Sequence, residues 1–334
     1  MIRLAIIGLG HWGPNYLRNF SQEKNCCLVA CLDANAERIK LFQDKYPSVH
    51  FYTDLDSMLA KESLDAAVLV TPTSTHFDLA QICLKKNLHI LIEKPFALIP
   101  EQCVALGALA QERKKILMVG HTFLYNGAVN WMKRFFEAGS AGRIYYLHAA
   151  RTNLGPIRQD VNALYDLAPH DISIFLYLLG LKPKAVSAQG AAFFNQNEDV
   201  VFLTLYFENK IMAHIHVSWL DPCKVRKITV IAEKQMLVFD DIDVAEPIRI
   251  YNKGVKPPKD IMDFSQFKAV VYDGDIVIPK IPLDEPLKIQ CQEFLKCVVE
   301  NKTPLSDARF GTAVVHILNK ATESLRSNGA IVAL

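Results

Sequence analysis

The chain has 334 residues, of which 51% are hydrophobic and 22% charged, and its formal net charge is +2 at pH 7. This length favours two domains, and the composition excludes a disordered chain. The near-neutral charge gives no basic field for nucleic acid. We also expect no membrane span, because no apolar stretch is long enough, and no secretion signal, because the N-terminus lacks a basic region and a cleavage site.

The first thirty-three residues follow the order strand, glycine turn, helix, strand and acid. Residues 4–7 are an apolar run, and Gly8, Gly10 and Gly13 fit the pattern G-x-G-x-x-G. A second apolar run at residues 28–32 ends in Asp33. Together these features are the dinucleotide-binding fingerprint of a Rossmann domain.

Each glycine of this turn has a physical role. Gly8 permits a tight turn, Gly10 lets the backbone approach a pyrophosphate, and Gly13 allows the helix to pack closely on the strand. The helix N-terminus then offers N–H groups to the anion. We therefore expect the cofactor to contact the whole turn, namely Gly8, Gly10, His11, Trp12 and Gly13.

Asp33 predicts which dinucleotide binds. A carboxylate accepts hydrogen bonds from both ribose hydroxyls and repels a 2′-phosphate, which favours NAD. Arg38 follows five residues later and would weaken this preference if it faced the ribose, whereas a solvated helix charge would not. A preference for NADP therefore remains an alternative.

The rest of the first domain alternates strands and helices, which predicts a doubly wound parallel sheet. We expect strands at 49–52, 66–70, 88–92 and 116–119, and helices at 35–45, 54–60, 77–86 and 101–114. Gly120 marks the boundary, so the predicted domains are residues 1–120 and 121–334.

Two polar loops follow buried strands of this sheet, where ligands of open α/β sheets bind. The first contains Thr71, Pro72 and His76, for which a plain helix cap by Ser74 or Thr75 is the alternative. The second is Glu93-Lys94-Pro95. Buried charge is costly unless it is paired or used, so Glu93 and Lys94 are candidate cofactor contacts. Lys94 would also stabilise a substrate oxygen as charge develops on it, and a surface ion pair is the alternative.

The pattern changes after residue 120. We expect helices at 129–138, 172–179, 287–300 and 309–327, a strand at 144–150, a long polar loop at 151–160, and an antiparallel meander of strands at 184–192, 199–207, 211–219, 227–232 and 236–240. This is an α+β domain with a large, mostly antiparallel open sheet. The imperfect alternation of Phe202, Leu205, Phe207 and Ile215 would leave an apolar sheet face, which favours a homodimer or homotetramer.

Asp166 and His170 precede an apolar helix. Pro169 is expected only in a first helical turn, which places Asp166 at the helix start and His170 within that turn. Residues four apart share one side of a helix, so the two side chains form a candidate acid–base pair. Alternatively, Asp166 caps the helix and His170 packs.

These motifs, in this order, resemble the glucose–fructose oxidoreductase / inositol dehydrogenase / MocA family over essentially the whole chain. The most specific are Glu93-Lys94-Pro95 and Asp166-x-x-x-His170. The resemblance implies hydride transfer between a sugar-like CH–OH and the nicotinamide of NAD. It also implies that Lys94 positions the reacting oxygen, His170 is the general base and Asp166 assists it.

Within that family, residues 121–126 and 153–158 are similar to those of nucleotide-sugar dehydrogenases, including those that oxidise C3 of UDP-N-acetylglucosamine or its uronate. This implies a substrate site made of Tyr125, Arg151, Asn153, Arg158, Asp166 and His170. Arg151 and Arg158 would bind a diphosphate or carboxylate, or alternatively form salt bridges to Asp160 or Asp166.

Two other functions remain open at this point. One is the same chemistry on a free sugar or inositol, and the other is an NAD(H)-binding sensor without turnover. None of the eight cysteines forms a C-x-x-C pair, so we expect reduced thiols in a cytosolic protein, and no metal.

Overall fold

The computed structural model describes residues 1–194, 196–256, 270–282 and 284–334. The chain divides into two compact units. Unit 1 comprises Met1–Tyr125 and Asp284–Asn319, and unit 2 comprises Asn126–Leu283 and Lys320–Leu334. The first division lies close to the expected one at residue 120, but residues 284–319 group with the first unit and not with the second.

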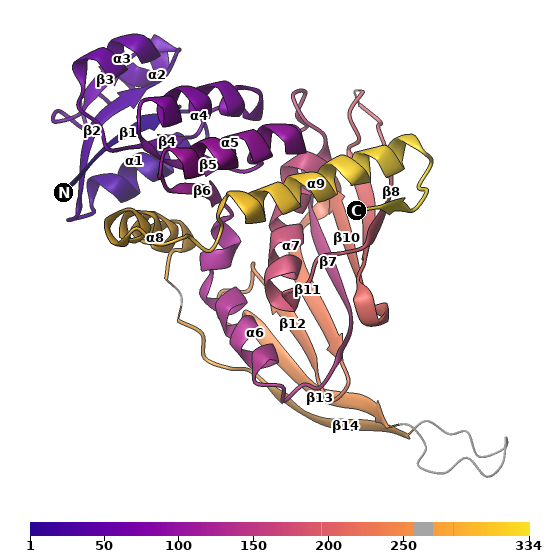
Figure 1. Ribbon diagram of the computed structural model, residues 1–334. Helices are drawn as coiled ribbons and strands as arrows, with labels where there is room; N and C mark the ends of the chain where they lie inside the picture. Colours follow the sequence, from indigo (N-terminus) through magenta and orange to yellow (C-terminus); the bar gives the residue numbers. More distant parts are fainter. Residues whose placement is uncertain (195, 257–269, 283) are drawn as a thin grey trace. The chain divides into compact units, whose positions relative to one another are not determined.

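Unit 1 contains a parallel sheet in the order β3-β2-β1-β4-β5-β6 (Figure 1). Its strands are short, and all except edge strand β3 are almost fully buried, as expected for a sheet covered on both faces. They are β1 (Ile2–Ile7), β2 (Cys26–Leu32), β3 (His50–Tyr52), β4 (Ala66–Leu69), β5 (His89–Glu93) and β6 (Leu117–Gly120). This arrangement confirms the predicted Rossmann domain.

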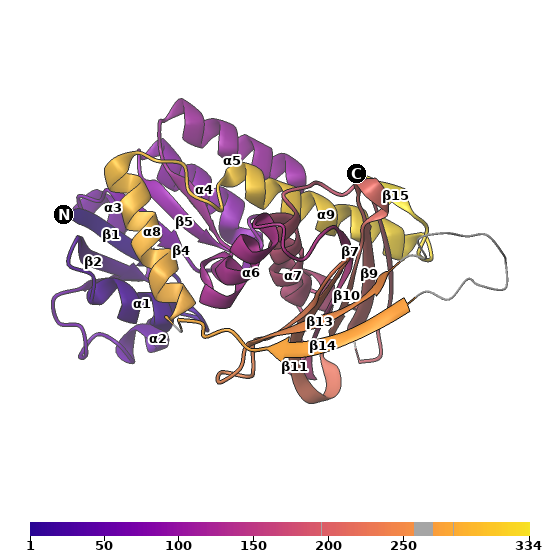
Figure 2. The same ribbon diagram turned by 90° about the horizontal axis from the view of Figure 1, so that it is seen from below.

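The helices of unit 1 follow its strands. They are α1 (Gly13–Ser21), α2 (Ala36–Lys40), α3 (Leu55–Lys61), α4 (His76–Lys85) and α5 (Pro100–Glu112), with short 3-10 turns η1 (Thr73–Thr75) and η2 (Thr122–Tyr125). Helices α4 and α5 lie side by side (Figure 2). Helix α2 ends at Lys40, earlier than the periodicity predicts, and the following residues form turns.

A late segment of the chain returns to unit 1. Helix α8 (Pro286–Glu300) packs against α1, and helix α9 (Ala308–Arg326) begins in this unit. Arg18 of α1 donates to Glu285 at 3.1 Å, and Gln290 of α8 reaches Tyr16 at 2.8 Å. These contacts join residues more than 260 positions apart, which no local sequence pattern reveals.

Unit 2 is built on a sheet of nine described strands in the order β14-β13-β12-β11-β7-β10-β9-β8-β15. The strands are β7 (Ile144–Leu154), β8 (Ala185–Ala191), β9 (Val200–Tyr206), β10 (Met212–Ser218), β11 (Leu220–Ala232), β12 (Met236–Asp240), β13 (Ile248–Lys256), β14 (Val270–Val277) and β15 (Val332–Ala333). The predicted mostly antiparallel sheet is confirmed.

Strand β7 corrects the expected meander. It lies between β10 and β11 and pairs in parallel with β10 and antiparallel with β11. Strands β8, β9 and β10 form a meander, but β10 and β11 are not neighbours, because β7 lies between them. Strand β7 also continues through Leu154, so residues 151–154 of the expected polar loop are part of the central sheet.

Helices α6 (Gly127–Glu137) and α7 (Ala163–Leu179) contact each other, and α7 packs against β7, β9 and β10. The side chain of Asn162 caps α7 by accepting from the Tyr165 N–H at 3.0 Å. Helix α7 therefore begins six residues before Pro169, and the expected start near Asp166 is wrong. Pro169 lies inside the helix, where the capped first turn and the buried face of α7 hold the backbone.

The open face of this sheet differs from the expected one. Leu205, Phe207 and Ile215 are buried, because period-two alternation turns odd-numbered residues of β9 and β10 toward the core. Even-numbered side chains cover the other face. The large exposed ones are Phe202 at 45%, Met212 at 50% and Tyr146 at 45% exposure.

The cysteines are mostly inaccessible. All eight are free thiols, and only Cys223 is exposed. Burial raises the pKa of Cys31 and Cys83 to about 12, which keeps these thiols protonated and unreactive. Across the described ranges, no helix is both long enough and apolar enough to cross a membrane.

Candidate active site

The glycine turn after β1 has the geometry of a dinucleotide cradle. Gly8 has a φ of +106°, and a Cβ on it would meet the Val70 carbonyl oxygen at 2.6 Å. A Cβ on Gly13 would overlap the Gly8 carbonyl, so helix α1 can approach this closely only with glycine. Above Gly10 a Cβ meets only an Arg38 nitrogen, at 3.8 Å, which leaves this stretch of backbone open to a pyrophosphate.

Asp33 closes the same turn from strand β2. Its carboxylate accepts the Leu9 N–H at 2.7 Å and the Asn35 N–H at 2.8 Å. The guanidinium of Arg38 is 3.5 Å from the oxygen that Leu9 uses. The oxygen bonded by Asn35 therefore keeps acceptor capacity for a ribose hydroxyl. Arg38 thus lies beside the glycine turn and Asp33, and is not a helix charge remote from this site.

The loop after β4 packs against this turn. The Cγ2 of Thr71 lies 3.0 Å from where a Cβ on Gly8 would be. The Thr75 hydroxyl donates to Thr71 Oγ1 at 2.7 Å and contacts the Pro72 carbonyl at 2.8 Å, and no side chain caps α4. The side chain of Thr75 therefore does not cap helix α4, which was the alternative expected from the sequence.

His76 joins the two polar loops. Its Nδ1 lies 3.0 Å from the Pro95 carbonyl oxygen and its Nε2 lies 3.0 Å from that of Thr71. The protonated nitrogen donates to one of these carbonyls. Burial lowers the pKa of His76, and hydrogen bonds to the two carbonyls oppose the shift. The ring is fully buried, so its link to a cofactor runs through the loops that it joins.

Glu93 is the centre of a buried hydrogen-bond chain. Tyr16 donates to its Oε1 at 2.6 Å, and Gln290 donates to Tyr16 at 2.8 Å. The other oxygen, Oε2, accepts the backbone N–H of Lys94 at 2.9 Å. Burial raises the pKa of Glu93, and the Tyr16 bond and the Lys94 charge act against that rise. Glu93 therefore fixes the backbone that carries Lys94, and its carboxylate is buried and does not lie on the surface.

Strands β5 and β6 place Lys94 beside His121. Glu93 pairs with Gly120 in the parallel register, so Lys94 and His121 are the next residues on neighbouring strands. His121 is 1% exposed. Burial, followed by the charge of Lys94, lowers the pKa of His121 to about 3, so the imidazole is neutral at pH 7.

In unit 2, Asp166 and His170 lie on one face of helix α7, four residues apart. The carboxylate of Asp166 is held from two sides. Trp219 Nε1 donates to its Oδ2 at 3.2 Å, and Arg158 Nη1 donates to its Oδ1 at 2.9 Å. Asp166 is thus an oriented carboxylate, and the residue that caps the helix is Asn162.

The two candidate arginines have different surroundings. Arg158 bonds Asp160 at 2.6 and 2.9 Å as well as Asp166, which matches the salt-bridge alternative. Arg151 is 3% exposed and forms a bidentate ion pair with Asp171, both bonds being 2.9 Å. That pair joins β7 to α7 next to His170. The ion-pair partner of Arg151 is therefore Asp171, and not Asp160 or Asp166 as expected.

Two further predicted substrate residues, Tyr125 and Asn153, are held by hydrogen bonds within the protein. The Tyr125 hydroxyl shares a hydrogen bond of 3.2 Å with Ser306, and burial raises the pKa of this tyrosine. The Asn153 amide donates to the Gly155 carbonyl. By contrast, His11 and Trp12, at the cofactor turn, are exposed.

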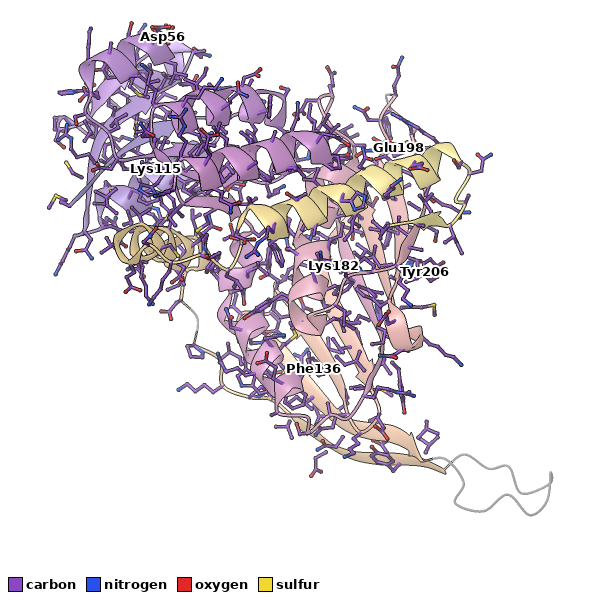
Figure 3. All side chains as sticks on the ribbon, in the orientation of Figure 1. Asp56, Lys115, Phe136, Lys182, Glu198 and Tyr206 are labelled. Carbon is purple, nitrogen blue, oxygen red and sulfur yellow. The ribbon has the colours of Figure 1, made fainter. Side chains whose placement is uncertain are left out.

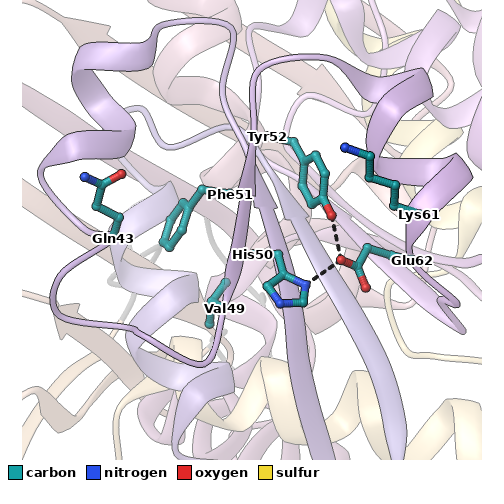
Figure 4. Close-up of a pocket in the computed structure, with 7 residues that line it drawn as sticks. All are labelled: Gln43, Val49, His50, Phe51, Tyr52, Lys61 and Glu62. Carbon is teal, nitrogen blue, oxygen red and sulfur yellow. Dashed lines mark hydrogen bonds and ion pairs between the residues drawn. The ribbon is translucent and has the colours of Figure 1, made fainter.

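A pocket lies along edge strand β3 of unit 1 (Figure 4). His50 and Tyr52 both point to Glu62, each at 2.6 Å from its Oε1, so these groups satisfy one another. None of the residues singled out in the sequence lines this pocket. Among the residues that the structure describes, no cluster of histidine, cysteine and acidic side chains is arranged to hold a metal.

Sequence reasoning missed several residues that shape these sites. Tyr16, Gln290 and Trp219 carry no local signal, because each acts through a partner distant in sequence. His121 had a usable signal. It follows a buried strand directly, as Lys94 does, and polar residues in that position meet at one edge of a parallel sheet.

Comparisons with known proteins agree with this geometry. Residues 2–121 match the family model of an oxidoreductase family with an NAD-binding Rossmann fold, and residues 129–238 match the GFO/IDH/MocA C-terminal domain. The UDP-N-acetylglucosamine 3-dehydrogenase of Acidithiobacillus ferrooxidans is 31% identical over 261 residues, which are 76% of this chain and 78% of that protein.

One solved structure and one further relative are also similar to this chain. A solved structure of that Acidithiobacillus enzyme superimposes with a TM-score of 0.82 at 25% identity, covering 98% of each chain. The scyllo-inositol 2-dehydrogenase (NAD(+)) of Bacillus subtilis is 30% identical over 222 residues, covering 62% of this chain and 64% of that protein. The chain therefore belongs to the GFO/IDH/MocA family of oxidoreductases, and its first unit is an NAD-binding Rossmann domain.

Proposed function

We propose that this enzyme oxidises a secondary hydroxyl of a sugar, or reduces the corresponding ketone, with Lys94, His170 and Asp166 as its reacting groups. The observation that carries the proposal is the buried Gln290–Tyr16–Glu93 chain, which fixes the backbone of a lysine at the edge of the NAD-binding sheet. Packing alone gives no reason to hold a lysine there.

The proposed roles follow from the chemistry of each side chain. Lys94 donates a charge-assisted hydrogen bond to the substrate oxygen and stabilises the negative charge that grows on it. His170 removes the hydroxyl proton, and Asp166 orients the substrate or His170 through the carboxylate that Trp219 and Arg158 hold. When bound, NAD⁺ accepts the hydride from the carbon that carries this hydroxyl.

For the substrate we propose a nucleotide sugar, UDP-N-acetylglucosamine or its uronate, reacting at C3. The name of the Acidithiobacillus relative supports this choice over 76% of the chain. The pairing of Arg158 with Asp160 and Asp166 gives it less support, because a diphosphate there would compete with two carboxylates. The free-polyol alternative is supported by the Bacillus inositol dehydrogenase.

A substrate panel separates these possibilities. Purified enzyme with NAD⁺ is mixed with UDP-sugars, the matching free sugars and inositols, and NADH absorbance is followed. We expect turnover with a UDP-N-acetylhexosamine and little with its free sugar. Faster turnover of inositol contradicts the nucleotide-sugar choice. No turnover at all, with a sugar-induced rise in melting temperature, supports the NAD(H)-binding sensor.

We further propose that a second copy of the chain covers the open face of the sheet in unit 2. Phe202 stacks on His216 with ring centroids 4.4 Å apart, and Met212 and Tyr146 lie exposed on the same face. An apolar face of this kind in water favours self-association. Light scattering should give the mass of a dimer or tetramer, and Met212→Asp with Phe202→Asp should lower it. A monomeric wild-type enzyme contradicts the proposal.

A further inference from the structure

His121 stands where two neighbouring parallel strands end. Glu93 of β5 is paired with Gly120 of β6, and the chain then continues into Lys94 on one strand and His121 on the other. Both residues belong to unit 1, so their proximity depends on one sheet only. The charge of Lys94 also contributes to the lowered pKa of His121, as expected for close neighbours.

The burial of His121 is unusual for a polar side chain. The residue is 1% exposed, and in the part of the chain that the structure describes neither ring nitrogen has a hydrogen-bond partner. Its ring lies edge-on to Phe310 of α9 with centroids 5.6 Å apart. Leaving buried polar atoms without a hydrogen bond destabilises a fold, so packing alone would favour phenylalanine here.

We propose that His121 is a positioning residue for Lys94: its neutral imidazole accepts a hydrogen bond from the Lys94 ammonium when substrate is bound. This inference rests on the proposed role of Lys94 in the reaction. A lysine ammonium has three donors, of which the reacting oxygen needs one. A second bond to His121 would hold the flexible side chain in one rotamer.

A neutral acceptor suits this role better than a charged one. A carboxylate at position 121 would neutralise the ammonium and weaken its attraction to the developing oxyanion. A cationic imidazole would repel Lys94, but burial keeps His121 neutral at pH 7. The carboxylate of Glu93, which precedes Lys94, already accepts hydrogen bonds from Tyr16 and from the Lys94 backbone N–H.

The test is a double-mutant cycle on kcat. His121→Phe keeps the ring and its packing on Phe310 but removes the acceptor, and His121→Gln restores an acceptor. We expect His121→Phe to lower kcat about 10- to 100-fold, since small displacements of a reacting group cost that much. His121→Gln should recover part of the loss, and NADH affinity should stay within about twofold of wild type.

The Lys94→Ala background decides the mechanism. If His121 acts through Lys94, adding His121→Phe to Lys94→Ala should lower kcat no further. The alkaline limb of the kcat profile should also move to lower pH in His121→Phe, because the ammonium loses an acceptor. Additive losses, or an unmoved limb, overturn the proposal. If Lys94→Ala alone has no effect, the role of Lys94 in the proposed function fails first.

His89 supplies a matched control. It is a half-buried histidine at the opposite end of β5, where its Nδ1 accepts the Ile116 N–H at 3.0 Å, and burial lowers its pKa to about 4. His89→Gln should change the melting temperature but leave kcat and its pH profile unchanged. If His121→Phe does not fold, His121→Leu replaces it as the variant without an acceptor. It is then compared with His121→Gln in the wild-type and Lys94→Ala enzymes.

Discussion

Replacing Lys94 by alanine should lower kcat about a thousand-fold while the enzyme still binds NADH. The expected loss of kcat follows from the negative charge on the substrate oxygen that the Lys94 ammonium stabilises. An oxygen that loses its proton as hydride departs develops alkoxide character, and removing one donor to such an oxygen typically costs about 10²- to 10³-fold. The full charge of lysine places the effect at the upper end.

The loss should come from the reaction and not from the fold. Glu93, Tyr16 and Gln290 hold the backbone of residue 94 through its N–H, and alanine keeps that N–H. The cofactor turn and Asp33 follow strands β1 and β2, and Asp33 is bonded to the turn through the Leu9 N–H, not through the Lys94 side chain. NADH affinity by fluorescence titration and the melting temperature should therefore stay close to wild type.

Graded variants sharpen this prediction. Lys94→Met preserves the apolar stem without charge and should resemble alanine, whereas Lys94→Arg retains the charge and should recover part of the rate. Lys86→Ala, at the exposed C-terminal end of α4, is the matched lysine control and should not change kcat. Equal kcat values in wild type and Lys94→Ala would remove Lys94 from the mechanism.

The parts of this molecule that were predictable are those encoded in short stretches. The glycine turn with Asp33 needs only thirty-three residues, because the turn geometry and the start of the helix arise locally. The alternation of buried strands and helices predicted the parallel sheet in the same way. Lys94 drew attention in the same way, because a charged residue directly after a buried strand requires a reason, and its role stays a prediction.

The parts that were missed depend on contacts between distant segments. Strand β7 enters the sheet between β10 and β11, and no property of residues 144–154 indicates that place. Helix α8 packs on α1 through residues that read as an ordinary amphipathic surface. Pro169 misled the prediction for α7, because tertiary packing around a buried helix tolerates a proline that an isolated helix would not.

Replacing His170 by asparagine should lower kcat about 10²- to 10⁴-fold, the usual contribution of a general base. Asparagine has a similar size and keeps polar atoms, so helix α7 should stay intact between its Asn162 cap and the Arg151–Asp171 ion pair. NADH affinity should not change. His148→Asn, on the exposed side of strand β7 in the same unit, is the matched control and should retain full activity.

The pH dependence of the residual rate distinguishes a base from a packing residue. A histidine base must be neutral to accept the hydroxyl proton, so the wild-type kcat should fall on the acidic side of its profile. In His170→Asn that acidic limb should disappear, and the remaining rate should rise with hydroxide concentration. Added imidazole should restore part of the activity of His170→Ala by occupying the space left by the side chain.

A profile in His170→Asn that keeps the wild-type acidic limb, together with no response to imidazole, would show that another group takes the proton. Asp166, held by Trp219 and Arg158, would then be the first candidate, because its carboxylate lies on the same face of α7.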